Sequence, residues 1–386
     1  MKLFIIPSWY PTKLHPENGS FFRDWAILLN DSGIEIVVIT HVVHSFKDVI
    51  YHGKMQSTEF QIDNKVPVYI NESINKFPWI QILAFTSYKN HIIKLYNKAA
   101  DEQGIPDLVL FHSSLWASTA LSNKLKGSKI PYIIIEHLKE FLIPNGFTPF
   151  QTKLIEKTYH SCAKIVVTSS ALEKAVNNKF PAHKEKLVII PNPIDEDKFI
   201  LNTRSNKQSF ITIICIALFR PEKRVDLIIH AFSKLVKSGI QCKLKLIGDG
   251  PLMSDLKGQV DKLDIGNKVQ FLGYLPSNRI VEELHKSDLF VLASDMETFG
   301  AVLIEAQACG LPVVATDCGG PSDIVSSDTG VRVKSGSVDD LTRGIKDVIN
   351  KLDQFNPVKI RNRTIKYFGK KTYTEAIKRV VGKIIK

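Results

Sequence analysis

Short apolar runs alternate with longer amphipathic segments along this chain, and after residue 210 the same rhythm starts again. Segments of helical period separate several of the runs, as strands and helices do in parallel sheets that are covered on both faces. We therefore predict an α/β protein with two doubly wound domains, which suits 386 residues at roughly 100–200 residues per domain. The runs interpreted as buried strands are Leu3–Ile6, Ile36–Ile39, Leu108–Phe111, Tyr132–Ile135, Ile165–Thr168, Ile211–Ala217, Lys243–Ile247, Val269–Leu272, Leu289–Leu292 and Val313–Ala315. The clearest helical segments are Phe21–Leu29, Leu154–Cys162, Val225–Lys237 and Val302–Cys309.

Residues 195–210 are polar and lack periodicity, as expected of a linker between two domains. We place the first domain in residues 1–195, the second in 205–365, and a terminal segment in 366–386. Open parallel sheets bind their ligands beyond the carboxyl ends of the strands. The loops that follow the strands are therefore where we expect a site.

Composition excludes several classes of protein. No uninterrupted apolar run reaches the roughly 18 residues of a membrane-spanning helix. The run Leu3–Ile6 ends at Pro7 and is too short for a secretory signal peptide. Five cysteines without a C-x-x-C pair predict neither a disulfide framework nor a cysteine zinc site, so we expect a cytoplasmic protein.

Two segments have unusual surface chemistry. The last 36 residues hold eleven Lys and Arg but only two Asp and Glu, against a net charge of +12 for the whole chain. Such a tail is either a solvated helix face or a surface for anionic lipid or nucleic acid, and without a recognisable nucleic-acid module we do not expect nucleic acid. The apolar segment Phe77–Phe85 is by default buried core, with a membrane-facing patch as the alternative.

Residues 287–320 are the most informative part of the chain. A predicted strand, Leu289–Leu292, leads through a loop to a helix that should begin near Phe299 and Gly300 and stop at Gly310. The first amides of a helix are unpaired and carry partial positive charge, so a helix start that follows a strand suits a phosphate. Gly300 would let the ligand approach the backbone closely.

Two carboxylates, Glu297 and Glu305, flank this predicted phosphate seat. Carboxylates accept hydrogen bonds from paired hydroxyls, and a nucleotide-sugar has ribose hydroxyls on one side of its diphosphate and hexose hydroxyls on the other. The alternative is that Glu297 caps the helix and Glu305 lies on the surface.

Glu297 and Glu305, with Phe299-Gly300 between them and Gly310 after them, resemble the E-x7-E signature of family 4 retaining glycosyltransferases. The resemblance implies the GT-B fold, in which two Rossmann-like domains face each other across a cleft and the terminal helix, here 366–386, crosses back to the first domain. The other segments that resemble the family are Leu218–Phe232, Ile247–Pro251, Phe271–Tyr274, and Pro191–Asp195 with Phe199.

The resemblance also implies roles for single residues of the donor site. Glu305 would hold the ribose, Glu297 would contact the donor sugar, and Lys223 would neutralise the departing diphosphate, unless Lys223 is merely a solvated lysine. The remaining donor-binding positions are Thr298, Phe299 and Gly300 at the helix start, and Gly248 in the loop after a strand.

The chain departs from the family pattern at two places. Leu218 stands where the family usually has an arginine, so Arg220 is the candidate for that role. Asn192-Pro193 stands where asparagine-glycine is more common, and proline cannot adopt the backbone of a left-handed glycine.

Candidate residues of the first domain follow its strands. Gly19 matches the family's glycine-containing first loop, although an ordinary turn with a helix cap is the alternative. His137 matches the family's active-site histidine, near the sugar C6 hydroxyl. His112 and Glu136 are weaker candidates at neighbouring strand ends.

The resemblance implies a retaining glycosyltransferase that moves a hexose from a UDP- or GDP-linked donor to a glycan or lipid-linked acceptor, in polysaccharide or surface-glycan assembly. No cofactor or metal is expected, since the acidic run Asp195–Asp197 lies in the linker, away from the helix seat. Peripheral contact with the inner face of a membrane would follow if the basic tail bound anionic lipid. The alternatives are a catalytically inactive homologue, for which Leu218 is the main reason, and another GT-B enzyme such as a sugar-nucleotide epimerase.

Overall fold

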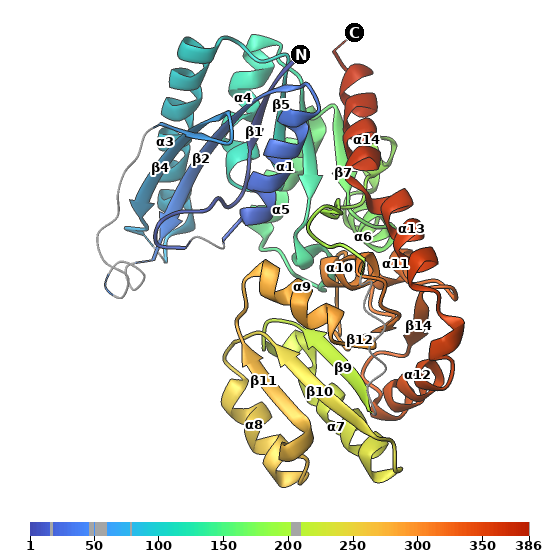
Figure 1. The fold of residues 1–386 in the computed structure, drawn as a ribbon. Helices are drawn as coiled ribbons and strands as arrows, with labels where there is room; N and C mark the ends of the chain where they lie inside the picture. The colour runs from blue at the N-terminus through green and yellow to red at the C-terminus, as the bar shows by residue number, and fades with distance from the viewer. Residues whose placement is uncertain (16–17, 46–49, 51–59, 78, 202–209, 386) are drawn as a thin grey trace. The chain divides into compact units, whose positions relative to one another are not determined.

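A computed structural model describes residues 1–15, 18–45, 50, 60–77, 79–201 and 210–385, and the chain divides into two compact units (Figure 1). Unit 1 comprises Met1–Thr168, Glu173–Ile190 and Thr374–Lys386, and unit 2 comprises Ser169–Leu172 and Pro191–Tyr373. The chain thus enters unit 2 at Pro191, before the predicted linker, whose residues 202–209 lie outside the described part.

Unit 1 is built on a sheet with the strand order β3-β4-β2-β1-β5-β6-β7-β8. Among the strands that the structure describes, β3 alone pairs antiparallel, with β4, and the other neighbours are parallel. All five residues of β5 and all five of β6 are buried, because helices cover both faces of the sheet. The strands are β1 Lys2–Ile6, β2 Glu35–His44, β3 Gln61–Asp63, β4 Val66–Ile74, β5 Leu108–His112, β6 Tyr132–Glu136, β7 Lys164–Val167 and β8 Leu187–Ile189.

The helices of unit 1 connect these strands and have local sequence causes. The helix α5, for example, begins with a capping box in which Thr148 and Gln151 satisfy each other's backbone amides, and a proline follows Thr148 directly. The helices are α1 Ser20–Asp31, α3 Gln81–Gln103, α4 Ala117–Ser128, α5 Pro149–Ser161, α6 Ser170–Lys179 and, from the C-terminal end, α14 Lys370–Gly382.

Unit 2 has an entirely parallel sheet of the order β11-β10-β9-β12-β13-β14. Along β9, Ile213 and Cys215 enter one hydrophobic core while Ile214 and Ile216 enter the other, as the two-residue period of a strand requires. The strands are β9 Ile211–Ile216, β10 Cys242–Ile247, β11 Val269–Gly273, β12 Leu289–Leu292, β13 Val313–Thr316 and β14 Gly330–Val333. The helices are α7 Val225–Lys237, α8 Met253–Lys262, α9 Ser277–His285, α10 Ala301–Ala308, α11 Pro321–Ile324, α12 Val338–Asn350 and α13 Pro357–Phe368.

One prediction about the core is wrong. Apart from residue 78, which lies outside the described part, the segment Phe77–Phe85 is not buried: Trp79 is 92% exposed, and Ile80, Ile82 and Leu83 are also exposed. The reason is that α3 packs on the sheet only from Tyr88 onward, so that its first two turns have no core to enter.

Much of the basic tail makes contacts within the protein. The Arg361 guanidinium donates to the carbonyl oxygens of Phe199, Ala308 and Glu196. Lys370 forms ion pairs with Asp195 and Asp197, so the acidic run of the predicted linker is held by a lysine. Further along α14, Lys378 donates to the carbonyl oxygen of Ser32 within unit 1.

Candidate active site

The strand order of unit 2 reverses at β9, which lies between β10 and β12. Such a reversal opens a crevice at the carboxyl ends of the strands, where open α/β sheets bind ligands. Lys223 follows β9 and Glu297 follows β12, and the Lys223 Nζ lies 2.5 Å from the Glu297 Oε1. The Ser294 hydroxyl donates to the same carboxylate oxygen at 2.7 Å. The structure therefore brings two predicted site residues, 74 positions apart, into one ion pair.

A glycine pair after β13 fixes the backbone around Glu297. The Glu297 amide donates to the Cys318 carbonyl at 3.1 Å, and the Gly320 amide donates to the Glu297 carbonyl at 2.8 Å. A Cβ on Gly320 would lie 2.2 Å from the Phe299 carbonyl oxygen, and one on Gly319 would lie 2.5 Å from that of Glu297. Only glycines allow this loop to pack against residues 297–299.

A second link joins the loops after β9 and β12. The Arg224 guanidinium pairs with Asp295 at 3.2 Å, and the Asp295 amide donates to the Glu222 carbonyl at 2.9 Å. Arg224 has a left-handed backbone with φ 48°, and it also pairs with Asp226 at 3.1 Å. We did not predict this link. The sequence signal that could have indicated it is that Arg224 follows Lys223 directly and Asp295 lies two residues before Glu297.

Helix α10 begins at Ala301, where it was predicted to begin, with Gly300 as its N-cap. Gly300 has φ 100°, which favours glycine over any residue with a side chain. The Phe299 side chain is buried and packs edge-on against the Phe368 ring, so only the backbone of Phe299 can serve the predicted role. Thr298 is half-buried beside it.

Glu305 lies on the second turn of α10 and is half-buried. Burial raises the pKa of its carboxyl to about 7, and the charge of Lys198 offsets part of this effect. Near neutral pH the ionised form is therefore costly unless hydrogen-bond donors reach it, and a pair of hydroxyls would supply such donors.

Gly248 belongs to the loop after β10 and has φ 135°. A Cβ there would lie 1.8 Å from the carbonyl oxygen of Ala217, in the loop after β9. The contact between the two loops thus requires glycine. Leu218 and Arg220, at the family's arginine position and at its candidate substitute, are both exposed near this contact.

The candidates of unit 1 gather around its own reversal point, where β1 lies between β2 and β5. Gly19 is the N-cap of α1 with φ 72°, and a Cβ there would lie 2.4 Å from the Trp9 carbonyl oxygen. The His112 Nδ1 and the His137 Nε2 are 3.0 Å apart, so one imidazole donates to the other. Burial lowers the pKa of His137 to about 3. Burial also lowers the pKa of His112 well below its usual range, and the neighbouring His137 imidazole lowers the pKa of His112 further. Both rings are therefore neutral near pH 7.

Glu136 precedes His137 in the sequence but faces the core. It is fully buried and accepts a hydrogen bond from the Tyr159 hydroxyl at 2.7 Å. Burial raises the pKa of its carboxyl to about 7, against the lowering effect of the Ser114 and Tyr159 hydrogen bonds. These contacts favour the reading of Glu136 as the end of a strand over a role in acid–base chemistry.

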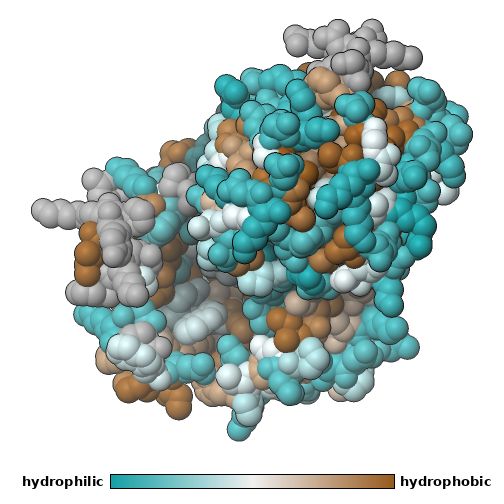
Figure 2. Space-filling model, turned by 90° about the horizontal axis from the view of Figure 1, so that it is seen from below, coloured by the Kyte–Doolittle hydropathy of each residue, from teal (hydrophilic) through white to brown (hydrophobic). Residues whose placement is uncertain are grey.

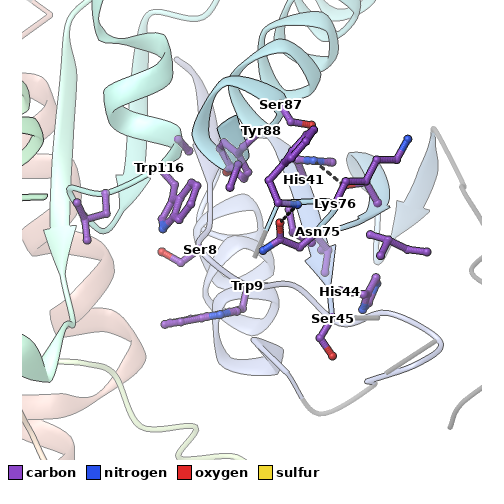
Figure 3. A pocket seen from close by; sticks show the side chains of 18 of the residues that line it. Ser8, Trp9, His41, His44, Ser45, Asn75, Lys76, Ser87, Tyr88 and Trp116 are labelled. Atoms are coloured by element: carbon purple, nitrogen blue, oxygen red, sulfur yellow. Dashed lines mark hydrogen bonds between the residues drawn. The ribbon is translucent and has the colours of Figure 1, made fainter. Parts of the chain in front are cut away.

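A pocket of about 560 Å³ opens in unit 1 (Figure 3). In this view the rings of Trp9 and Trp116 lie on one side, and Lys76 and His44 lie on the other. Ser113 and Trp116 also line the pocket, and both have positive φ angles, 86° and 62°. Backbone strain at residues other than glycine is typical of functional sites, so this pocket is a candidate ligand site of unit 1.

We did not single out the pocket residues His41, Tyr88 and Trp116 from the sequence. His41 follows the predicted strand Ile36–Ile39 by two positions, so the rule of strand ends could have found it. Its ring stacks on that of His91 at 4.6 Å, and its Nδ1 lies 3.1 Å from the Asn71 carbonyl oxygen. Burial lowers the pKa of His41 to about 4.

Two family models match consecutive parts of the chain. The model described as "Glycosyl transferases group 1" matches residues 195–370, and that described as "Glycosyltransferase Family 4" matches residues 19–198. The chain is a group 1 glycosyltransferase of the family 4 type. The two matches meet where the chain enters unit 2, so each unit of this glycosyltransferase corresponds to one model.

Relatives of the glycosyltransferase cover most of its length. The N-acetyl-alpha-D-glucosaminyl L-malate synthase of Bacillus anthracis is 28% identical over 302 residues, which is 75% of each protein. The phosphatidylinositol N-acetylglucosaminyltransferase GPI3 subunit of Saccharomyces cerevisiae is 23% identical over 328 residues, which is 83% of this chain and 69% of the yeast protein.

Solved structures resemble the whole chain. Sucrose-phosphate synthase from Thermosynechococcus elongatus has a TM-score of 0.78 at 15% identity and covers 100% of this chain and 99% of its own. The structure of Anabaena HepE in complex with UDP and glucose has a TM-score of 0.74 at 18% identity, and the match covers 99% of this chain and 100% of the HepE chain. These matches confirm the predicted GT-B fold class, with two α/β units on parallel-sheet cores.

Two searches of the described residues had negative results. No group of three or more His, Cys, Asp and Glu side chains among them is arranged to hold a metal ion. None of the helices that the structure describes is long and apolar enough to span a membrane.

Proposed function

We propose that this glycosyltransferase is a retaining hexosyltransferase, which works without a metal ion and takes its hexose from a UDP- or GDP-linked donor. The observation that carries the proposal is the ion pair between Lys223 and Glu297 at the reversal point of unit 2. Glu297 lies three residues before Gly300, the N-cap of α10. Positive charge, a free helix start and a carboxylate are the groups that a sugar diphosphate requires in one place.

The donor would lie along the start of α10. Its diphosphate would meet the amides after Gly300 and the Lys223 ammonium, its hexose hydroxyls would bond Glu297, and its ribose would bond Glu305. The ammonium and the helix terminus supply the positive charge that a metal ion supplies in other transferases. Arg220 is exposed on the same loop as Lys223 and is our candidate for a further phosphate contact.

In the proposed reaction the bond between the anomeric carbon and the phosphate oxygen breaks, and a bond from the acceptor oxygen to that carbon forms. The acceptor attacks from the face on which the diphosphate departs, and its proton passes to the leaving phosphate oxygen. This route needs no protein base, and a neutral His137 would position the sugar by a hydrogen bond.

The acceptor would occupy the pocket of unit 1, whose aromatic walls suit a sugar ring or an apolar group. We propose a hydroxyl of a glycan or of a lipid-linked glycan as the nucleophile, in polysaccharide or surface-glycan assembly. The relatives act on acceptors as different as L-malate and phosphatidylinositol, as their names state, and HepE was solved with UDP. We therefore rank UDP-sugars first among the donors.

The decisive experiment measures thermal melting with UDP, GDP, ADP and their sugars, each with magnesium and with EDTA, followed by an assay of sugar transfer. A ligand at 100 times its Kd stabilises the folded protein by about 2.7 kcal/mol, so the true donor should raise the Tm clearly, and equally without magnesium. The anomeric configuration of the product, read by NMR, should equal that of the donor.

Two results would contradict the proposal. A nucleotide that binds without any transfer to a panel of acceptors would indicate an inactive homologue, with Leu218 as the first suspect. Conversion of the free nucleotide-sugar into a stereoisomer would indicate an epimerase.

The pH dependence of donor binding should report on Glu305. Below pH 7 this carboxyl takes up a proton and loses its charge, so its hydrogen bonds to the ribose weaken by about 1 kcal/mol. We therefore expect the Kd of a UDP-sugar to rise about fivefold between pH 8 and pH 5.5, as measured by calorimetry. A nucleotide-sugar is used because a terminal phosphate titrates near pH 6 itself.

The control for this titration is Glu305→Gln, which cannot ionise and should bind weakly at every pH. A pH slope that persists in this variant would assign the titration to another group.

A further inference from the structure

The start of α3 exposes a group of large apolar side chains on unit 1. We define the α3 tip as Trp79, Ile80, Ile82 and Leu83, which are 92%, 53%, 63% and 42% exposed. Single exposed apolar residues are ordinary on a protein surface, but a contiguous group marks an interaction site. Brown hydrophobic areas interrupt the teal surface on the face that Figure 2 displays.

The α3 tip does not belong to the buried stripe by which α3 packs on the core of unit 1. From Tyr88 onward α3 buries a regular stripe at helical spacing, which continues through Ile92 and Leu95 to Ala99. Before Tyr88 the same helix turns apolar side chains to solvent, and its first turn lacks an acidic residue. None of the four tip residues is buried, so they add little to the core of unit 1, and the exposure of so much apolar surface implies a use outside the fold.

The charges around the α3 tip select its partner. Residues 73–100 contain four lysines, at positions 76, 89, 94 and 98, and not a single Asp or Glu. A Trp and aliphatic side chains at the start of a helix, on a stretch of chain whose Lys, Arg, Asp and Glu are all lysines, are the composition of a helix that docks on an anionic lipid surface. A protein partner would not need so one-sided a charge.

The α3 tip adjoins the pocket of unit 1. Lys76 and Phe77, directly before the tip, and Ala84 and Tyr88, directly after it, all line that pocket. The Trp116 ring lines the pocket and contacts α3 just after the tip, at 6.0 Å from the Phe85 ring and 5.5 Å from that of Tyr88. Whatever binds the tip is held at the rim of the pocket.

We propose that the α3 tip inserts into an anionic bilayer and thereby brings the unit 1 pocket to an acceptor that is anchored in that bilayer by a lipid. The membrane contact stands on the tip alone, whereas the choice of a lipid-anchored acceptor rests on the proposed function. The proposal places membrane contact on unit 1 at α3, instead of on the basic tail, where Arg361 and Lys370 are engaged within unit 2.

The test is co-sedimentation of the full chain with vesicles of phosphatidylcholine, with or without 30% phosphatidylglycerol. We expect binding to the anionic vesicles, at least a tenfold weaker binding to the neutral ones, and a decline with salt. The variant Trp79→Ser, Ile82→Ser, Leu83→Ser should lose at least tenfold in vesicle affinity while its Tm stays unchanged, because these side chains are exposed.

The matched control is Ile105→Ser, Ile200→Ser, Val358→Ser, which removes three aliphatic side chains that are 73%, 50% and 50% exposed at other sites. It should bind vesicles like the parent chain. The proposal would be overturned if both variants lost vesicle affinity equally, or if the tip variant bound vesicles like the parent chain. If the tip variant binds fully and the variant Lys371→Glu, Lys383→Glu does not, the membrane contact belongs to the tail. Dimerisation that only the tip variant abolishes would instead make the tip an interface between copies.

A second measurement separates the membrane contact from the proposed function. With the donor identified, transfer to a lipid-anchored acceptor in vesicles should fall at least tenfold in the tip variant, and transfer to a water-soluble analogue of that acceptor should not. Vesicle binding needs no donor, so a chain that binds vesicles but no nucleotide would refute the proposed function and leave the membrane contact standing.

Discussion

Lys223→Ala is expected to lower kcat for sugar transfer by about 10²–10³, the usual loss when one charge-stabilising group of a transition state is removed. In the resting protein the Lys223 ammonium neutralises Glu297, and in the proposed reaction it faces the diphosphate as negative charge develops there. Because that charge is larger in the transition state than in the bound donor, the KM of the donor should change by much less than kcat. Initial rates at several donor concentrations separate the two effects.

Two further variants make this test specific. Lys223→Arg keeps the charge and should recover part of the lost rate, whereas Lys262→Ala, at the end of α8, removes a lysine without effect. Glu297 keeps its hydrogen bond from Ser294 in Lys223→Ala, so the Tm should fall only slightly. A normal kcat in Lys223→Ala would remove this lysine from the mechanism, and a fall in Tm that matches the fall in rate would make its role structural.

The architecture could be predicted because its causes are local. Buried parallel strands are continuous apolar runs, and β9, β12 and β13 were found for that reason. Strand β4, Val66–Ile74, escaped prediction because Pro67 and the polar residues after Ile70 interrupt its pattern. Its first half is buried beside β2, but the second half is only partly covered, so periodicity gave no clear signal.

Donor-site candidates could be found from the sequence where the type and position of a residue indicate its role. They could not be found where the role depends on which other residues the side chain contacts. The helix start at Gly300 was predicted from residue type and spacing, and Glu297 and Glu305 became candidates through their spacing together with the family resemblance. The Arg224–Asp295 pair and the packing of Gly320 on Phe299 depend on which loops the sheet order brings together. Strand order is a property of the whole unit, and no local pattern in the sequence specifies it.

The same limit explains the wrong prediction at α3. An apolar segment is buried only if a neighbour covers it, and the sequence does not show that α3 buries its side chains only from Tyr88 onward. The segment was correctly recognised as apolar, but a helix was not predicted there, and the exposure of its side chains is decided by where Tyr88 begins to pack. Exposed apolar residues of this type therefore point to function only after the fold is known.

Gly248→Ala should strongly destabilise unit 2. The new methyl group would lie 1.8 Å from the Ala217 carbonyl oxygen, and the backbone would keep a φ of 135° that alanine rarely adopts. Strain of this kind costs about 1–3 kcal/mol, and overpacking against backbone that cannot rotate away costs about as much again. We expect the free energy of unfolding to fall by about 2–6 kcal/mol in urea titrations of the full chain.

Gly258→Ala is the matched control for this prediction. Gly258 lies inside α8, and a Cβ there would meet no atom within 4 Å, so alanine should stabilise the helix by up to about 1 kcal/mol. The same chemical change would thus act with opposite sign at two positions ten residues apart, because Gly248 lies where the loops after β9 and β10 touch and Gly258 does not. Since the loop after β9 carries Lys223, any Gly248→Ala protein that folds should also bind the donor more weakly than Gly258→Ala. Equal stability of the two variants would show that the loops can separate without cost, and would remove Gly248 from the donor site.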